Sequence, residues 1–145
     1  MKRLAVFVLA LALTGCSAAG GTTLSQGVTV TGSGEDTLVT VCALTLDGDG
    51  KIASVRWDAA EGKGAPSKKQ QGSGYGMGAA SPIGREWDQQ VAALEEYAVG
   101  KTPEQVTTMA LTDYGAPAVE QLTSSCTIAV GDFLKSLEQA VKAAK

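Results

Sequence analysis

Histidine is absent from this chain of 145 residues. Its absence excludes a Ser-His-Asp hydrolase, a His-ligated zinc site and proton transfer through an imidazole. Cysteine is scarce, with three residues and no Cys-x-x-Cys pair, and aromatic residues make up only 5% of the chain. Any chemistry must therefore come from carboxylates, hydroxyls, backbone amides, a thiol or a bound cofactor.

Long hydrophobic runs are also lacking, and the clearest apolar run lies at the N-terminus. Residues 4–13 carry no charge, but a permanent transmembrane helix needs about 20 apolar residues. The run follows Lys2 and Arg3 and leads into the tetrapeptide LTGC, which ends at Cys16. This order is typical of a secretory signal. LTGC resembles a bacterial lipobox, which implies that Cys16 becomes the lipidated first residue; an ordinary signal peptide is the alternative.

The sequence thus divides into three parts. We expect residues 1–15 to be a lipoprotein signal peptide, residues 16–26 a small, polar and flexible tether, and residues 27–145 one folded domain. The resemblance to a lipobox implies a protein of the cell membrane, held by its lipid anchor on the extracytoplasmic face.

The charge balance is acidic. Removing Lys2 and Arg3 from the 12 basic residues leaves 10 against 15 acidic residues, a net charge of −5 for the expected mature chain. An acidic surface argues against nucleic acid as a partner and against a polybasic membrane patch. It selects no other partner.

Residues 27–57 carry the signals of a β-hairpin. Valine alternates with threonine over residues 28–31, and residues 37–46 are rich in Val, Leu and Thr with apolar side chains on both faces. The Asp-Gly-Asp-Gly turn at residues 47–50 is followed by a second alternating run at residues 51–57. This pattern predicts two antiparallel strands, the first of them covered on both faces.

A long segment rich in glycine, serine and lysine follows at residues 59–81. Four glycines alternate with larger residues over residues 72–78, which predicts a loop rather than a strand or helix. One interpretation is a plain surface loop. The other is a loop whose backbone approaches a flat ligand, with Tyr75, Gly76 and Met77 in contact with it.

Three helices are expected after this loop. Ser81 and Pro82 are typical of a helix start, and the apolar stripe that follows ends at Gly100. A Thr-Pro-Glu-Gln capping box predicts a short helix over residues 102–110, and apolar spacing predicts the last helix over residues 128–143. The fold class expected is therefore a single small α+β domain, in which an antiparallel β-sheet with a β-hairpin is followed by helices that pack on it.

Two cysteines remain if Cys16 is lipidated. Cys42 and Cys126 are compatible with a disulfide, because the expected compartment is oxidising. They are equally compatible with two small buried residues that never meet.

The segment with the most chemical potential precedes the last expected helix. Ser124, Ser125 and Thr127 place three hydroxyls where that helix would present unpaired N–H groups. The segment predicts either N-terminal capping, for which Ser and Thr are the usual residues, or a phosphate site, since helix N-termini bind phosphate.

The order of these features resembles the FMN-binding domain family of extracytoplasmic flavin lipoproteins and membrane electron-transport subunits. The hairpin at residues 39–55, the middle section at residues 75–102, the Ser-Ser-Cys-Thr motif at residues 124–127 and the helix at residues 128–140 carry the resemblance. In covalent members a separate flavin transferase joins the threonine that closes the motif to FMN through a phosphoester. The resemblance implies that this threonine is Thr127.

The cofactor-binding residues expected on this basis are Thr127, Ser124, Ser125, Tyr75, Gly76 and Met77. The motif departs from the family pattern at three positions: Ser125 stands where the family has glycine, Cys126 where it has alanine, and Gln121 where it has an acidic residue. Covalent attachment, non-covalent FMN binding and a fold that carries no flavin therefore remain alternatives.

Two functions follow as hypotheses. The first is a flavin-based electron carrier, rather than a turnover enzyme, working between a membrane electron donor and an external acceptor. The second is a non-redox surface or binding lipoprotein that keeps the fold without flavin. No catalytic residue and no metal ligand is expected; chemistry at the Cys126 thiol is a third and weaker hypothesis.

Overall fold

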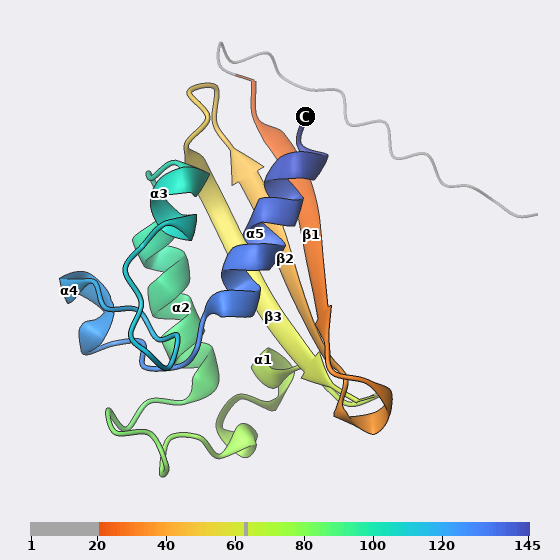
Figure 1. Ribbon diagram of the computed structural model, residues 1–145, viewed down its shortest axis with the longest axis vertical. Coiled ribbons are helices and arrows are strands. Elements are labelled where there is room, and N and C mark those ends of the chain that lie inside the picture. The colour runs from red at the N-terminus through yellow and green to blue at the C-terminus, as the bar shows by residue number, and fades with distance from the viewer. Residues whose placement is uncertain (1–20, 63) are drawn as a thin grey trace, which may run out of the picture.

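The sheet of this protein has three antiparallel strands in the order β1-β2-β3 (Figure 1). A computed structural model describes residues 21–62 and 64–145, so the expected signal peptide and Cys16 lie outside the described residues. The strands are β1 (Thr23–Thr31), β2 (Leu38–Leu46) and β3 (Ile52–Glu61). The hairpin predicted from residues 37–57 is confirmed, and its tight turn is closed by hydrogen bonds between Asp47 and Lys51.

In the described part of the chain, five α-helices and two short 3₁₀ helices accompany the sheet. The α-helices are α1 (Lys68–Gln71), α2 (Trp87–Ala98), α3 (Pro103–Thr107), α4 (Glu120–Thr123) and α5 (Gly131–Ala143); the 3₁₀ helices are η1 (Gly34–Asp36) and η2 (Gly72–Tyr75). The predicted fold class, one α+β domain with helices on an antiparallel sheet, is confirmed. No helix within residues 21–62 and 64–145 combines the length and the apolar character that crossing a bilayer requires.

Helix α5 crosses β1 and β2, whereas α2 lies along β3, as Figure 1 shows. The core between these layers centres on Trp57, which is fully buried and whose Nε1–H donates to the Phe133 carbonyl at 3.1 Å. The Phe133 ring lies 5.8 Å from that of Trp87 in an edge-on arrangement. Aromatic side chains of strand β3, helix α2 and helix α5 therefore join the two layers.

A glycine in β1 permits the close approach of α5. A Cβ atom on Gly27 would lie 1.9 Å from the Ser136 carbonyl oxygen and 2.5 Å from the Ala140 nitrogen, both in the backbone of α5. Any larger residue here would force the helix away from the sheet. Gly27 also stands inside β1, because the strand starts at Thr23, four residues before the expected start of the domain. The tether predicted for residues 16–26 is therefore too long at its C-terminal end.

The sheet is covered on one face only by the described residues. Val41, at the centre of β2, is exposed, which corrects the expectation that this strand is buried on both faces. The apolar pattern of residues 37–46 was compatible with two covered faces. The five described α-helices all follow the sheet in sequence, however, and the long helices α2 and α5 pack on the face where Cys42 and Leu44 are buried.

Several element boundaries also differ from the prediction. Helix α2 begins at Trp87 and not at Ser81, because Glu86 and Gln89 form a capping box that satisfies its first turn. Residues 72–75 form η2 rather than an irregular loop. The capping box of Thr102 and Gln105 at the start of α3 is confirmed.

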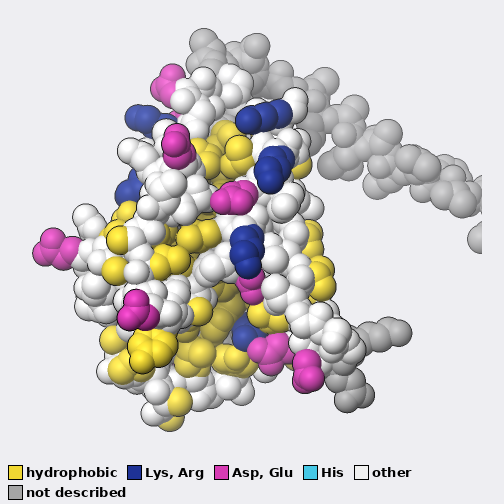
Figure 2. Space-filling model, viewed as in Figure 1, with side chains coloured by type: hydrophobic (Ala, Val, Ile, Leu, Met, Phe, Trp, Pro, Cys, Tyr) yellow, Lys and Arg dark blue, Asp and Glu magenta, His cyan; other side chains and the backbone are white. Residues whose placement is uncertain are grey.

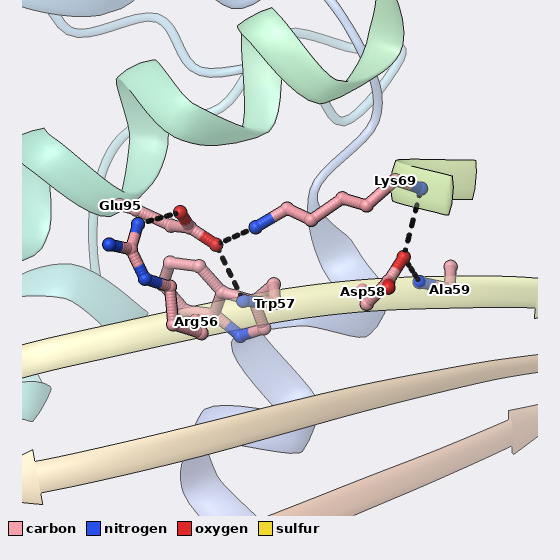
Figure 3. Close-up of polar contacts among 6 residues, drawn as sticks. All are labelled: Arg56, Trp57, Asp58, Ala59, Lys69 and Glu95. Carbon is pink, nitrogen blue, oxygen red and sulfur yellow. Dashed lines mark hydrogen bonds and ion pairs between the residues drawn. The ribbon is translucent and has the colours of Figure 1, made fainter. Parts of the chain in front are cut away.

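A buried carboxylate holds α2 against the free edge of β3 (Figure 3). Glu95 accepts the backbone N–H of Trp57 at 2.7 Å, the guanidinium of Arg56 at 2.8 Å and the ammonium of Lys69. Asp58 completes the edge by accepting the backbone N–H groups of Ala59 and Lys69. Charged side chains thus satisfy an edge beside which the described residues place no further strand.

We predict that Glu95→Ala lowers the free energy of unfolding by about 2–3 kcal/mol, because the buried N–H of Trp57 loses its acceptor. Arg56 is largely solvent-exposed, so the ion pair itself adds little. Urea unfolding followed by Trp fluorescence measures the change. Glu96→Ala, the exposed neighbour, is the matched control and should change stability by no more than about 0.5 kcal/mol. Equal effects of the two substitutions would contradict a special role for Glu95.

Candidate functional site

The hydroxyl-rich segment lies between two helices and caps neither N-terminus. Helix α4 ends at Thr123, and Ser124 follows as its C-terminal cap. The Ser125 hydroxyl donates to the backbone carbonyls of Gln121 and Leu122, at 3.4 Å each. Helix α5 starts only at Gly131, so the last helix begins three residues later than predicted. The segment therefore lies at no helix N-terminus, which corrects the capping prediction and removes the helix N-terminus as the reason for a phosphate site.

Thr127 is instead fixed by a side chain of α2. Its backbone N–H donates to Oε1 of Gln90 at 2.8 Å, and its Oγ1 lies 3.2 Å from the same oxygen. The hydroxyl thus donates its proton to an amide oxygen and keeps its lone pairs available. Thr127 is half-buried.

Gln90 organises this region, although its side chain is completely buried. Its Nε2 group donates to the Arg85 carbonyl at 3.0 Å and to the Ser81 hydroxyl at 3.2 Å, and it lies 3.7 Å from the Met77 sulfur. Every polar atom of the amide is therefore engaged, as burial requires. The sequence analysis missed Gln90; the signal was a polar residue on the apolar stripe of α2, three residues after Trp87.

Two cavities meet at Thr127. The larger, here called the Thr127 pocket, has a volume of about 560 Å³. It is lined by Thr112, Asp113, Tyr114, Ala116, Pro117, Thr123, Cys126 and Thr127. The smaller, of about 210 Å³, is lined by Met77, Ala80, Ser81, Pro82, Gln90, Thr127 and Ile128. The volume of the Thr127 pocket falls in the range of small-molecule sites, about 300–1,000 Å³.

The rim of the Thr127 pocket carries an aromatic ring that sequence reasoning also missed. Tyr114 is 91% exposed, on a turn closed by the hydrogen bond between Thr112 and Ala116 and by the bridge between Leu111 and Pro117. An aromatic side chain with almost no protein contacts on a well-formed turn is available to stack on a ligand. Figure 2 shows hydrophobic side chains gathered between the helices on this side of the molecule.

The structure brings together only part of the expected site. Met77 and Thr127 line the same small cavity, whereas Tyr75, Gly76, Ser124 and Ser125 line neither cavity at Thr127. Gly76 ends η2 with a φ of +77°, a conformation that favours glycine. Its place in the sequence thus reflects backbone geometry.

The ring of Tyr75 already makes a cation–π contact with a neighbouring lysine, Lys68. The Lys68 ammonium lies 4.8 Å from the centre of the Tyr75 ring and 2.6 Å from a carboxylate oxygen of Glu61. Burial lowers the pKa of Lys68, but the hydrogen bonds to Glu61 and Tyr75 outweigh it and raise the pKa above its ordinary value. Lys68 therefore stays charged on the ring of Tyr75.

Comparison with protein-family models, with curated proteins and with solved structures finds no significant match. The resemblance to the FMN-binding domain family therefore stays a proposal.

The two cysteines of the domain are separate buried thiols. Cys42 faces the core from β2 and Cys126 lies beside the Thr127 pocket, and neither forms a disulfide. Of the two alternatives left open by the sequence, the disulfide is thus wrong and the pair of separate buried residues is confirmed. Burial, together with the negative charge of Glu95, raises the pKa of Cys42 to about 12, and burial raises that of Cys126 to about 11. Neither thiol is an activated nucleophile.

We predict that Cys42 and Cys126 resist a soluble disulfide reagent in the folded protein at neutral pH and react when guanidinium chloride unfolds it. Because their pKa values are raised in the folded state, their contribution to stability is complete below pH 9 and is lost as the pH rises through about 11–12. Peptide mass mapping identifies the modified thiols. Detection of a peptide that links Cys42 to Cys126 in the non-reduced protein would contradict the prediction of two free thiols.

We further predict that Gln90→Leu lowers the free energy of unfolding by about 1–3 kcal/mol, because the Thr127 N–H loses its buried acceptor. Chemical denaturation measures the change. Gln139→Leu, on the exposed side of α5, is the control, with an expected change within about 0.5 kcal/mol. If both substitutions are neutral, the amide of Gln90 does not hold the Thr127 segment.

Proposed function

We propose that this protein is a lipid-anchored extracytoplasmic electron carrier that binds FMN in the Thr127 pocket. The observation that carries the proposal is the position of Thr127. The residue that the family resemblance aligns with the flavin-bearing threonine lies where two cavities meet, with its hydroxyl held by a buried amide. The cavities are defined without the resemblance, and Thr127 lines two of them.

The residues around Thr127 suit the uncharged parts of a flavin. The exposed ring of Tyr114 offers a flat surface for the isoalloxazine, and the hydroxyls of Thr112 and Thr123 offer polar contacts for the ribityl chain. A bound flavin supplies one- and two-electron transfer, for which the protein provides position and surroundings. The lipid anchor expected at Cys16 keeps the domain close to a membrane electron donor.

Thr127 offers two ways of holding the phosphate end. As a free hydroxyl, Thr127 keeps its hydrogen bond to Gln90 and can accept a hydrogen bond from the ligand through its oxygen lone pairs. As a phosphoester, made by a flavin transferase, Oγ1 no longer donates to Gln90, but the backbone N–H of Thr127 still does. The segment therefore keeps an anchor to α2 in either state.

The alternative is a non-redox binding lipoprotein, and one observation favours it. The lining of the Thr127 pocket includes one charged residue, Asp113, and no lysine or arginine. A free phosphate dianion gains no charge-assisted hydrogen bond from such a lining. A neutral or cationic small molecule would suit this pocket electrostatically, and the protein would then carry no flavin.

One preparation tests both functions. The full chain is produced in a bacterial host together with a flavin transferase, extracted from the membrane and examined by intact mass and flavin fluorescence. We expect acyl chains on Cys16 and a mass gain of one FMN less one water. Thr127→Ala should lose the FMN mass, and Ser124→Ala, the exposed hydroxyl that lines neither cavity, should keep it. Cys16→Ser should lose the acyl mass and leave the flavin unchanged.

Flavin that is present but extractable would support binding without the covalent bond. In that case Tyr114→Ala should weaken FMN binding by about tenfold, roughly 1.4 kcal/mol. Protein that contains no flavin, and binds none on titration with FMN, would remove the electron-carrier proposal and leave the non-redox lipoprotein.

A further inference from the structure

The outer face of the sheet carries a row of uncovered aliphatic side chains. Leu24, Val28, Val30 and Val41 are between 41% and 75% exposed. The exposed residues of β1, among them Leu24 and Val28, alternate with Ser25 and Gly27, which are buried on the opposite face under α5. The exposed side chains therefore share one surface, here called the open face, that no described residue covers.

The open face has an apolar centre and a polar margin. Val28 is the register partner of Val41, and Val30 is the partner of Val39, so the aliphatic rows of β1 and β2 lie side by side. A shallow depression of about 600 Å³ continues toward β3, where Arg56, Asp58 and Lys69 line it. An apolar centre with a charged margin is the usual anatomy of a protein interface.

The composition of the open face fits another sheet better than a lipid surface. Its β1 and β2 side chains are Leu, Val, Ala, Thr and Gln, with no aromatic residue, and the two basic side chains at its β3 margin, Arg56 and Lys69, are paired with Glu95. Membrane-interface surfaces carry Trp, Tyr, Lys and Arg at the headgroup level. Interdigitating β-branched side chains are, in contrast, what two aligned sheets bury when they pack face to face.

The position of the lipid anchor limits how two copies can meet. Only residues 17–22 separate Cys16 from the start of β1, and six residues span at most about 20 Å. A two-fold axis along the strands places both Thr23 residues at the same end, within reach of one bilayer. Antiparallel pairing of two β1 edges would instead separate the two Thr23 residues by nearly the strand length, about 30 Å. It would also leave the open face uncovered.

We propose that the open face binds the open face of a second copy, with the strands of the two sheets aligned and both lipid anchors leaving from one end. The orientation rests on the lipid anchor of the proposed function, whereas the choice of face rests on the exposed rows of β1 and β2. The dimer requires no flavin. The Thr127 pocket, formed by segments on the helical side, stays free in it.

Cross-linking in the host membrane tests the pairing on the full, lipidated chain. Val41→Cys, at the centre of the open face, should give a dimer band with a short bis-maleimide reagent. Val99→Cys is the matched control, since Val99 is 50% exposed and follows α2, outside the strands whose side chains form the open face. It should give no dimer band. Equal bands from both variants, or none from Val41→Cys, would overturn the proposal.

Native mass spectrometry of the detergent-extracted protein gives an independent measurement. The wild type and Val99→Glu should show the mass of two chains, and Val41→Glu should lose it while its circular dichroism spectrum stays that of the wild type. A monomeric wild type would overturn the proposal. Labelling of the Val41→Cys thiol by a lipid-dissolved photoreactive reagent would also overturn it, by assigning the open face to the bilayer. The same mass spectra also show whether Cys16 is acylated and whether flavin is bound. The proposed dimer, lipid anchor and cofactor can therefore be refuted independently of one another.

Discussion

The docking of α2 on the edge of β3 is the constraint on which the site depends. Glu95 fixes the helix by accepting the N–H of Trp57 and by pairing with Arg56 and Lys69. Gln90 lies five residues earlier on the same helix, and through it Thr127, Ser81 and the Met77 sulfur are brought to one point. A rotation or shift of α2 would move the amide of Gln90 away from all three. The edge of the sheet and the candidate site are thus two ends of one rigid element.

How far the sequence predicts this structure depends on whether a signal is local. The hairpin around residues 47–50 and the capping box at Thr102 are set by neighbouring residues, and both were predicted correctly. The start of α2 was placed too early because Ser81 and Pro82 mimic a cap. Ser81 is used instead by Gln90, a contact that no local pattern shows. The covering of β2 was misjudged for the same reason, since apolar residues on both faces do not tell which face the helices will take.

The candidate site shows the same division more sharply. Thr127 was singled out by resemblance and does border a cavity, but the expected reason, a helix N-terminus, is wrong because α5 begins at Gly131. Tyr114 and Gln90 were missed, since their roles come from exposure on a turn and from burial between helices. Tyr75 was proposed for stacking, yet a charged lysine already occupies its ring. The partners of a side chain, rather than its identity, decided each of these outcomes.

The contact between Gly27 and the backbone of α5 has a consequence for how the protein is made. The first strand of the sheet is closed by the last helix of the chain, so the core cannot be completed until residues near Ala140 are available. Contacts between such distant parts of a chain form late in folding. In the extracytoplasmic lipoprotein proposed above, a chain threaded N-terminus first through a narrow export channel therefore lacks its completed core until its far end has passed through.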